Sequence, residues 1–162
     1  MLSLFFLGKV FLCIFFLLQS TSIGSEDPKS LHIQANKKLY STGDLIFFKI
    51  YLPKNGYAYL LNQKADGTLH LIFPNDEDEN NKLNFGYSRL PSKNVDYEWV
   101  IDSSYGEEIF FLILSDKMIK FFHKKSVLKD QTLSTDNWLR RHTSDLLPWE
   151  WKITETKIRV KQ

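Results

Sequence analysis

Cysteine is almost absent from this chain of 162 residues, which contains Cys13 alone. Cys13 lies inside the apolar run from Val10 to Leu18, so a chain that loses this run has no cysteine. Lipid attachment would require small residues directly before the cysteine, but Phe11 and Leu12 stand there. Outside the apolar run, the sequence therefore allows no disulfide, no thiolate metal site and no thiol nucleophile.

An excess of charge of one sign is also missing. The 21 lysines and arginines nearly balance the 19 aspartates and glutamates, so the net charge is +2. Proteins that bind nucleic acid carry clustered basic residues that neutralise phosphates, whereas the basic residues here are scattered along the chain. The sequence therefore predicts no nucleic-acid partner and no strong attraction to anionic lipid.

Motifs for catalysis and metal binding are missing as well. The chain has no G-x-S-x-G turn and no phosphate loop, and its histidines are too scattered for a zinc motif: His32, His70, His123 and His142. The acidic run Asp76 to Glu79 offers oxygen ligands for calcium but lacks EF-hand spacing, so a solvated loop is the preferred interpretation. We therefore predict no catalytic residues, metal site or cofactor. The alternatives are a triad that assembles in space and a calcium site in this loop.

The first 24 residues differ from the rest of the chain. Lys9 precedes the apolar run VFLCIFFLL, and small polar residues follow this run. A basic residue, an apolar centre and a small-residue exit are typical of a secretory signal peptide. We expect cleavage after Gly24, with Ser22 and Ser25 as alternatives, or else an uncleaved membrane anchor formed by residues 1–24. The protein would then be exported to the periplasm, the outer surface or the medium.

Short strand patterns dominate residues 25–162. Runs rich in β-branched and aromatic residues predict strands at 31–34, 45–52, 57–62, 69–73, 87–90, 97–102, 108–115 and 149–160. Turn residues such as Asn55-Gly56 and Asp66-Gly67 separate these runs roughly every ten residues. The sequence therefore predicts a mainly β fold, in which residues 25–162 form one antiparallel β-sandwich domain.

Two segments near the C-terminus have a helical pattern instead. Residues 116–125 can begin with a cap at Ser115 or Asp116 and place Met118, Ile119 and Phe122 on one helical face. The second segment, residues 135–147, ends before a proline, which cannot continue a helix. We therefore expect one or two short helices between the last two strands.

The stretch GYAYLLNQKADGTLHLIFPN at residues 56–75 predicts a β-hairpin closed by Asp-Gly. Because side chains alternate along a strand, three residues of each run share one face: Tyr57, Tyr59 and Leu61 in the first, and Leu69, Leu71 and Phe73 in the second. A hairpin buried on at least one face explains nearly every residue of the stretch, so we assign no chemistry to it.

An ordered series of short motifs runs along the centre of the chain. The motifs are Tyr40-x-x-Gly43-Asp44, Gly56-Tyr57-x-Tyr59-Leu60-Leu61-Asn62, Asp66-Gly67, Leu71-x-Phe73-Pro74-Asn75, Asn81, Gly86, Leu90-Pro91 and Gly106-x-Glu108. Their order and spacing resemble the bacterial family called domain of unknown function 4384. The resemblance covers residues 39–115, and the extra segment of residues 116–162 lies outside the family's pattern.

What the resemblance implies is a β-sandwich accessory module of envelope or secreted proteins, which in other members is attached to protease-like, kinase-like or repeat domains. The family has no established catalytic residues, so we interpret the motif positions as structural: Tyr40, Gly43, Asp44, Gly56, Tyr57, Tyr59, Asp66, Gly67, Phe73, Pro74, Asn75, Pro91 and Gly106. A function peculiar to this protein is therefore expected in the extra segment.

Tryptophan and arginine in the extra segment are candidates for an interaction surface, because both are enriched at binding hot spots: Trp138, Arg140, Arg141, Trp149 and Trp151. The competing interpretation is core packing, since Trp149 and Trp151 share a face of the predicted last strand. We predict an exported, non-enzymatic β-sandwich module that binds an envelope protein or polymer, by aromatic contact or by strand addition. The alternative is a small exported hydrolase or a calcium-binding envelope protein. The membrane is a partner only through an uncleaved N-terminal segment.

Overall fold

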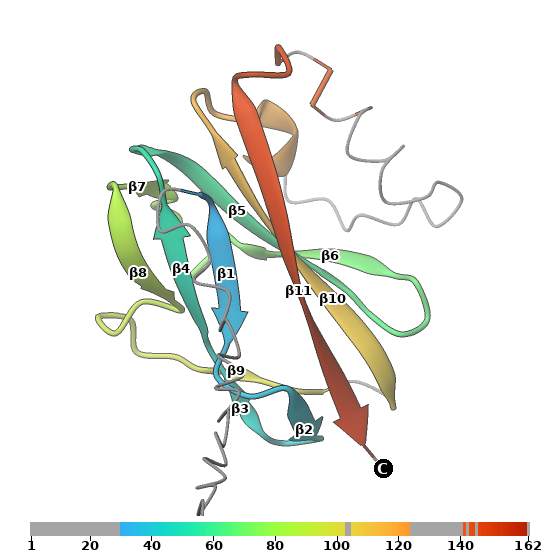
Figure 1. The fold of residues 1–162 in the computed structure, drawn as a ribbon. Coiled ribbons are helices and arrows are strands. Elements are labelled where there is room, and N and C mark those ends of the chain that lie inside the picture. Colours follow the sequence, from blue (N-terminus) through green and yellow to red (C-terminus); the bar gives the residue numbers. More distant parts are fainter. Residues whose placement is uncertain (1–29, 103–104, 124–140, 142, 145, 162) are drawn as a thin grey trace, which may run out of the picture.

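The computed structural model describes residues 30–102, 105–123, 141, 143–144 and 146–161 (Figure 1). This part of the chain is mainly β, as the sequence predicts, and its strands form several sheets that are antiparallel apart from one pairing. The predicted signal segment, residues 1–24, lies outside the described residues. Within the described ranges, no helix is long and apolar enough to cross a membrane.

The larger sheet has the strand order β2-β11-β10-β5-β6 (Figure 1). Its members are β2 (Leu39–Ser41), β11 (Trp151–Lys161), β10 (Gly106–Ser115), β5 (Gly56–Gln63) and β6 (Leu69–Phe73), and the short β7 (Lys82–Leu83) pairs with β5. β11 is antiparallel to β10 along the whole length of β10 and parallel to β2. The last strand of the chain therefore lies inside the sheet rather than at its edge.

The smaller sheet has the order β1-β4-β8, formed by β1 (His32–Ala35), β4 (Phe48–Leu52) and β8 (Gly86–Leu90); β3 (Leu45–Ile46) and β9 (Trp99–Val100) make a separate pair. The strand predicted at 45–52 is thus divided at Phe47. Asn36 provides the reason, because its Oδ1 accepts a hydrogen bond from the N–H of Phe47 (2.8 Å) and its Nδ2 donates to the carbonyl of Leu45 (3.4 Å).

Two apolar clusters lie on opposite faces of the larger sheet. The inner cluster joins this sheet to the smaller one, and its buried members include Ile33, Tyr40, Phe48, Ile50, Leu60, Phe73, Phe110, Leu112 and Ile158. The outer cluster lies on the other face and comprises Tyr59, Leu61, Leu69, Phe111, Ile113, Ile119 and Phe122. Successive side chains of β5 and β10 therefore pack alternately into the inner and the outer cluster, and both strands are almost completely buried.

The hairpin of β5 and β6 forms as predicted, but one of its residues faces the other way. Phe73 was expected on the same face as Leu69 and Leu71, yet it belongs to the inner cluster while Leu69 belongs to the outer one. A register shift between Leu60 and Leu61 causes this, because it inserts an irregularity into the pairing with β6.

The described residues between β10 and β11 contribute Ile119 and Phe122 to the outer cluster, but they do not form the expected helices. In the described part of the first predicted helix, residues 116–123, the only helical element is the 3₁₀ turn η1 (Lys120–His123). Ser115 explains this, because its hydroxyl bonds to the backbone N–H (3.3 Å) and carbonyl (2.7 Å) of Lys117 and so holds a tight turn. Of the second predicted helix, residues 135–140, 142 and 145 lie outside the described residues, and residues 143, 144, 146 and 147 are not helical.

Candidate functional site

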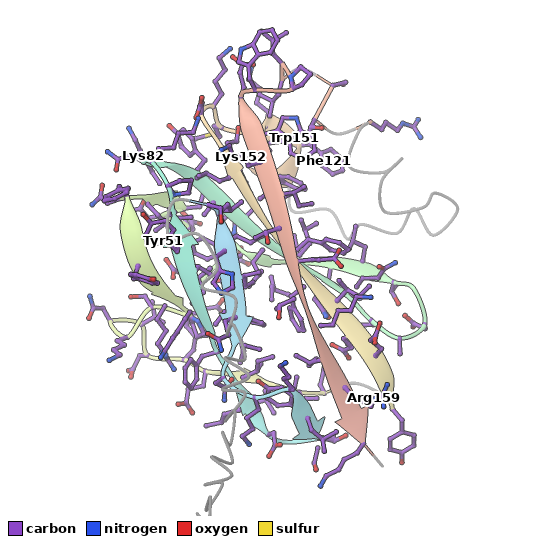
Figure 2. The ribbon with its side chains drawn as sticks, in the orientation of Figure 1. Tyr51, Lys82, Phe121, Trp151, Lys152 and Arg159 are labelled. Atoms are coloured by element: carbon purple, nitrogen blue, oxygen red, sulfur yellow. The ribbon has the colours of Figure 1, made fainter. Side chains whose placement is uncertain are left out.

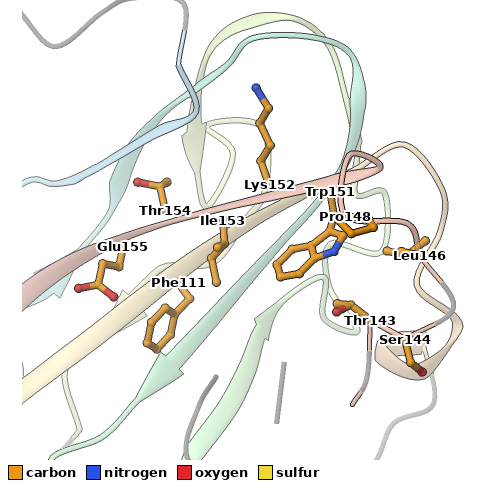
Figure 3. Close-up of a pocket in the computed structure, with 10 residues that line it drawn as sticks. All are labelled: Phe111, Thr143, Ser144, Leu146, Pro148, Trp151, Lys152, Ile153, Thr154 and Glu155. Carbon is orange, nitrogen blue, oxygen red and sulfur yellow. The ribbon is translucent and has the colours of Figure 1, made fainter. Parts of the chain in front are cut away.

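A groove of about 740 Å³ lies where β11 begins, on the outer face of the larger sheet (Figure 3). Apolar side chains form much of its lining: Phe111, Leu146, Pro148, Trp151 and Ile153. Polar ones complete it: Thr143, Ser144, Lys152, Thr154 and Glu155. We refer to it as the Trp151 groove. With few charged residues in this lining, the groove suits an apolar group more than an ionic ligand.

The turn of residues 147–150, which contributes Pro148 to the lining of the Trp151 groove, is held by hydrogen bonds at both ends. The N–H of Asp116 donates to the carbonyl of Glu150 (2.8 Å), and the carboxylate of Glu150 forms an ion pair with Lys117 and accepts from the N–H of Leu147 (2.8 Å). The ammonium of Lys117, and then the Leu147 N–H, hold the pKa of Glu150 below its usual value. The turn before β11 therefore has a defined shape.

The predicted interaction surface is divided in the structure. Trp149 is 71% exposed in the turn before β11, Trp151 is half-buried against the outer cluster, and Arg141 is exposed. The prediction that Trp149 and Trp151 share a face of the last strand is wrong, because β11 begins only at Trp151. Trp138 and Arg140 lie outside the described residues.

Tyr59 connects the family motifs to the extra segment. Its hydroxyl oxygen accepts a hydrogen bond from the backbone N–H of Ile119 (2.7 Å), and its ring packs on Phe122 with 4.8 Å between the ring centroids. Burial raises the pKa of Tyr59 above its usual value. This family-motif position therefore anchors the chain that covers the outer cluster.

The motif at residues 40–44 builds a turn. The hydroxyl of Tyr40 donates to Oδ1 of Asn36 (2.8 Å), and Oδ2 of Asp44 accepts from the N–H of Ser41 (3.0 Å). That N–H lowers the pKa of Asp44. Gly43 has φ of +90°, a value that side chains disfavour.

The other motif positions also take part in turns, close contacts or packing. Asp66 accepts from the N–H of Thr68 (2.8 Å) beside Gly67 at φ +86°, and Asn75 accepts from the N–H groups of Glu77 (3.1 Å) and Asp78 (2.8 Å). Gly56 lies so close to Ser115, and Gly106 so close to Ala65, that an added Cβ atom would overlap with these residues. Pro74 and Pro91 each follow a cis peptide bond. Tyr57 packs beside the outer cluster, and Phe73 lies in the inner one.

A buried polar pair joins two motifs that are far apart in the sequence. Nδ2 of Asn62 donates to Oε2 of Glu108 (2.9 Å), and Glu108 is only 2% exposed. Its other oxygen, Oε1, has no hydrogen-bond partner among the described residues. In the described part of the chain, no group of three or more His, Cys, Asp or Glu side chains could hold a metal ion.

The outer face of the smaller sheet carries a second set of exposed side chains. Tyr51 lies opposite Tyr87 across β4 and β8, with 4.9 Å between the ring centroids, and Lys49 lies opposite Arg89. Tyr87 is 75% exposed, and Phe85 beside Tyr51 is 62% exposed. Figure 2 shows Tyr51 on the smaller sheet, apart from Trp151 at the start of β11 and Phe121 in the turn η1. None of these side chains was among the predicted interaction residues, although Lys49 and Arg89 stand in predicted strands, where alternation was a usable signal.

The contacts define a mainly β fold in which the ordered motif positions maintain turns, packing and strand pairing. Residues 39–118 match the family model described as Domain of unknown function (DUF4384), so this segment belongs to that family, as the ordered motifs predict. The match ends between β10 and η1, and β11 with most of the Trp151 groove lies beyond it. No curated protein matches the chain.

Proposed function

We propose that this protein is an exported, non-enzymatic β-sandwich module that binds an envelope protein or polymer at the Trp151 groove. One observation carries the proposal: Trp149, 71% exposed, stands in the turn that leads into the groove. A large exposed aromatic beside an apolar depression has the properties of a binding hot spot, where a few residues provide most of the binding energy. A partner that inserts an apolar group into the groove would bury both the Trp149 ring and the apolar lining of the groove.

Two further features support the remaining parts of the proposal. The inner cluster takes side chains from both the larger and the smaller sheet, which is the packing that a sandwich requires. The signal-like pattern of residues 1–24 supports export to the periplasm, the outer surface or the medium. The family-like motif positions take structural roles, so binding at the extra segment would not disturb them.

Cross-linking in the native cell tests the proposal, with an affinity tag placed after Gln162. Mass spectrometry of the purified complexes identifies the partner and the mature N-terminus together. We expect one dominant partner, a chain that begins after Gly24, and loss of the partner in the variant Trp149→Ala. The matched control is Tyr105→Ala, because Tyr105 is another exposed aromatic, 58% exposed, and lies outside the groove.

A partner that both variants retain would contradict binding at the groove. Turnover of a substrate by the purified chain, abolished by single changes in the groove, would contradict a non-enzymatic role. Each variant is first compared with the parent by its thermal unfolding, so that loss of the partner is not confused with loss of the fold.

A further inference from the structure

We infer that the free edge of β8 is a second binding site, which takes an extended peptide with acidic side chains by strand addition. This site is distinct from the Trp151 groove, so its test can fail while the proposed function holds, and the reverse. The inference depends on three observations: the backbone groups of β8, the groove beside them and the charges on both sides of the strand.

β8 lies at the edge of the smaller sheet, where it pairs with β4 alone among the described strands. Phe47 directly precedes β4, and its carbonyl accepts a hydrogen bond from the N–H of Asn36, which follows β1. The backbone groups of Phe47 therefore point toward β1. Because backbone groups alternate in direction along a strand, Phe48, Ile50 and Leu52 direct theirs toward β8. Their partners in the register are Leu90, Ser88 and Gly86.

Tyr87 and Arg89 must then direct their N–H and C=O groups away from β4. In the described part of the chain, no hydrogen bond from another element reaches these four groups. An edge with unpaired backbone donors and acceptors is the template that an added strand uses. The spacing of the two residues matches the hydrogen-bonded positions of an antiparallel or parallel partner.

A groove of about 930 Å³ runs beside this edge. β8 and the residues that follow it form one wall, and the loop with Asp78 and Asn80 forms the other; Phe73, Leu83 and Leu90 supply apolar lining. Leu83 is half-buried, so part of this apolar surface is accessible. An extended peptide could place alternate apolar side chains against it, since successive residues of a strand point to opposite faces.

The charges on the β8 side of the groove favour carboxylates next to this strand, while the acidic run Asp76 to Glu79 lies on the opposite loop. Lys49 and Arg89 are directly opposite each other across β4 and β8, an arrangement that is unfavourable for like charges. Lys93 also lines the groove. None of these three cations has an ion pair in the described residues, and Asp78 is the only carboxylate among the lining residues. Carboxylates on the outward side chains of a peptide would remove this repulsion.

The test uses the purified protein and two synthetic peptides: acetyl-Val-Glu-Val-Glu-Val-Glu-Val-amide and its lysine counterpart. We expect the glutamate peptide to bind about tenfold or more tightly than the lysine peptide, which is the difference that one charge-assisted contact provides. Hydrogen exchange, followed residue by residue, should show that the amides of Tyr87 and Arg89 exchange more slowly when the glutamate peptide is bound.

Two substitutions at one position separate the backbone from the side chain. Tyr87→Pro removes the outward N–H but leaves the ladder with β4 intact, because proline is tolerated on an edge strand where its nitrogen faces solvent. We expect Tyr87→Pro to weaken binding of the glutamate peptide by about tenfold, which is the loss of affinity expected for one hydrogen bond. Tyr87→Thr keeps the N–H and removes the ring, and should change binding by no more than about threefold.

An equal loss in Tyr87→Pro and Tyr87→Thr would overturn strand addition and indicate binding to the aromatic face, as a sugar polymer would. Full binding by Tyr87→Pro would overturn the inference as well. If Tyr87→Pro does not fold, hydrogen exchange of the parent decides the question: bound peptide without protection of Tyr87 and Arg89 excludes this edge. Absence of binding by the glutamate peptide also counts against the inference.

Discussion

Asn62 and Glu108 place a carboxyl group inside a protein core that is otherwise largely apolar. Their hydrogen bond joins β5 to β10, and Oε1 of Glu108 has no second partner among the described residues. A buried polar group is tolerated when it is hydrogen-bonded and costly when it is not. The stability of this pair therefore depends on both partners being present.

Replacing one partner should therefore be worse than replacing both. Asn62→Leu leaves the Glu108 carboxyl without its amide donor, and we expect it to lower the free energy of unfolding by about 2 kcal/mol. The double variant Asn62→Leu/Glu108→Met removes both polar groups at similar volume and should recover about half or more of that loss. Urea unfolding of the parent, both single variants and the double variant measures this coupling.

Simple additivity of the two single changes would contradict this account of the pair. Local sequence does not reveal the pair itself, because Asn62 and Glu108 stand in separate motifs 46 residues apart. It did predict the alternation along β5 correctly: Tyr59 and Leu61 face the outer cluster and Leu60 the inner one. The face of Phe73 was wrong because no feature of the local sequence marks the irregular pairing.

At the scale of elements, the loop of the β5–β6 hairpin fixes where β10 begins. Gly106 has φ of +141°, and a Cβ atom added there would lie 2.5 Å from Cβ of Ala65 in that loop. We expect Gly106→Ala to lower the free energy of unfolding by about 2 kcal/mol, through steric overlap and backbone strain. Thermal or urea unfolding provides the measurement.

The double variant Gly106→Ala/Ala65→Gly separates these two causes. It removes the overlapping atom but keeps the strained φ, so it should recover about half of the lost stability. A double variant no more stable than Gly106→Ala would show that the contact with Ala65 is not responsible. The comparison also needs Ala65→Gly alone, since glycine adds freedom to the unfolded chain.

Strand positions were easier to predict than the segments that break them. The runs that became β5, β6 and β10 are long, apolar and bounded by turn residues, so local pattern determines them. The division at Phe47 depends on the Asn36 side chain, eleven residues earlier in the sequence. Ile119 and Phe122 are buried at a spacing of three residues, which fits a 3₁₀ turn as well as an α-helix.

At the scale of the whole molecule, the candidate site was only partly predictable because strand boundaries and the pairing of distant strands decide which side chains are exposed together. Residue type indicated Trp149 and Trp151, because tryptophan is enriched at interfaces, but their different exposure depends on where β11 begins. Lys49 and Arg89 become neighbours only when β4 pairs with β8. Surfaces made by pairing between distant strands cannot be read from local spacing.

Stability of the whole molecule should fall in alkali. Burial raises the pKa of Tyr40, Tyr59 and Tyr97 above the usual 10.0. The folded protein then holds these protons more tightly than the unfolded chain, so their contribution is complete below pH 10 and is lost as pH rises above it. Urea unfolding on both sides of pH 10 should show the decline, and Tyr59→Phe should make it less steep. An equal slope in parent and variant would contradict this role for Tyr59.

The family-matched segment should not form a stable fold by itself. Residues 39–118 include β2 through β10 but lack β1 and β11. β11 fills the position between β10 and β2 and adds Ile158 and Val160 to the inner cluster. Losing two such core side chains costs about 4 kcal/mol, a large part of the roughly 5–15 kcal/mol that stabilises a small domain. We therefore expect the 39–118 fragment to unfold without a cooperative transition.

Complementation in trans distinguishes a missing strand from a damaged fragment. The chain of residues 25–123 keeps Ile119 and Phe122 but lacks β11, and a synthetic peptide of residues 149–162 supplies β11 with the side chains that register against β10. We expect near-ultraviolet circular dichroism and a cooperative urea transition to return when this peptide is added, but not when a scrambled peptide is added. The parent chain of residues 25–162 gives the reference transition. Cooperative unfolding of residues 39–118 alone, with the stability of that reference, would mean that β11 is an addition to a complete domain rather than a part of its core.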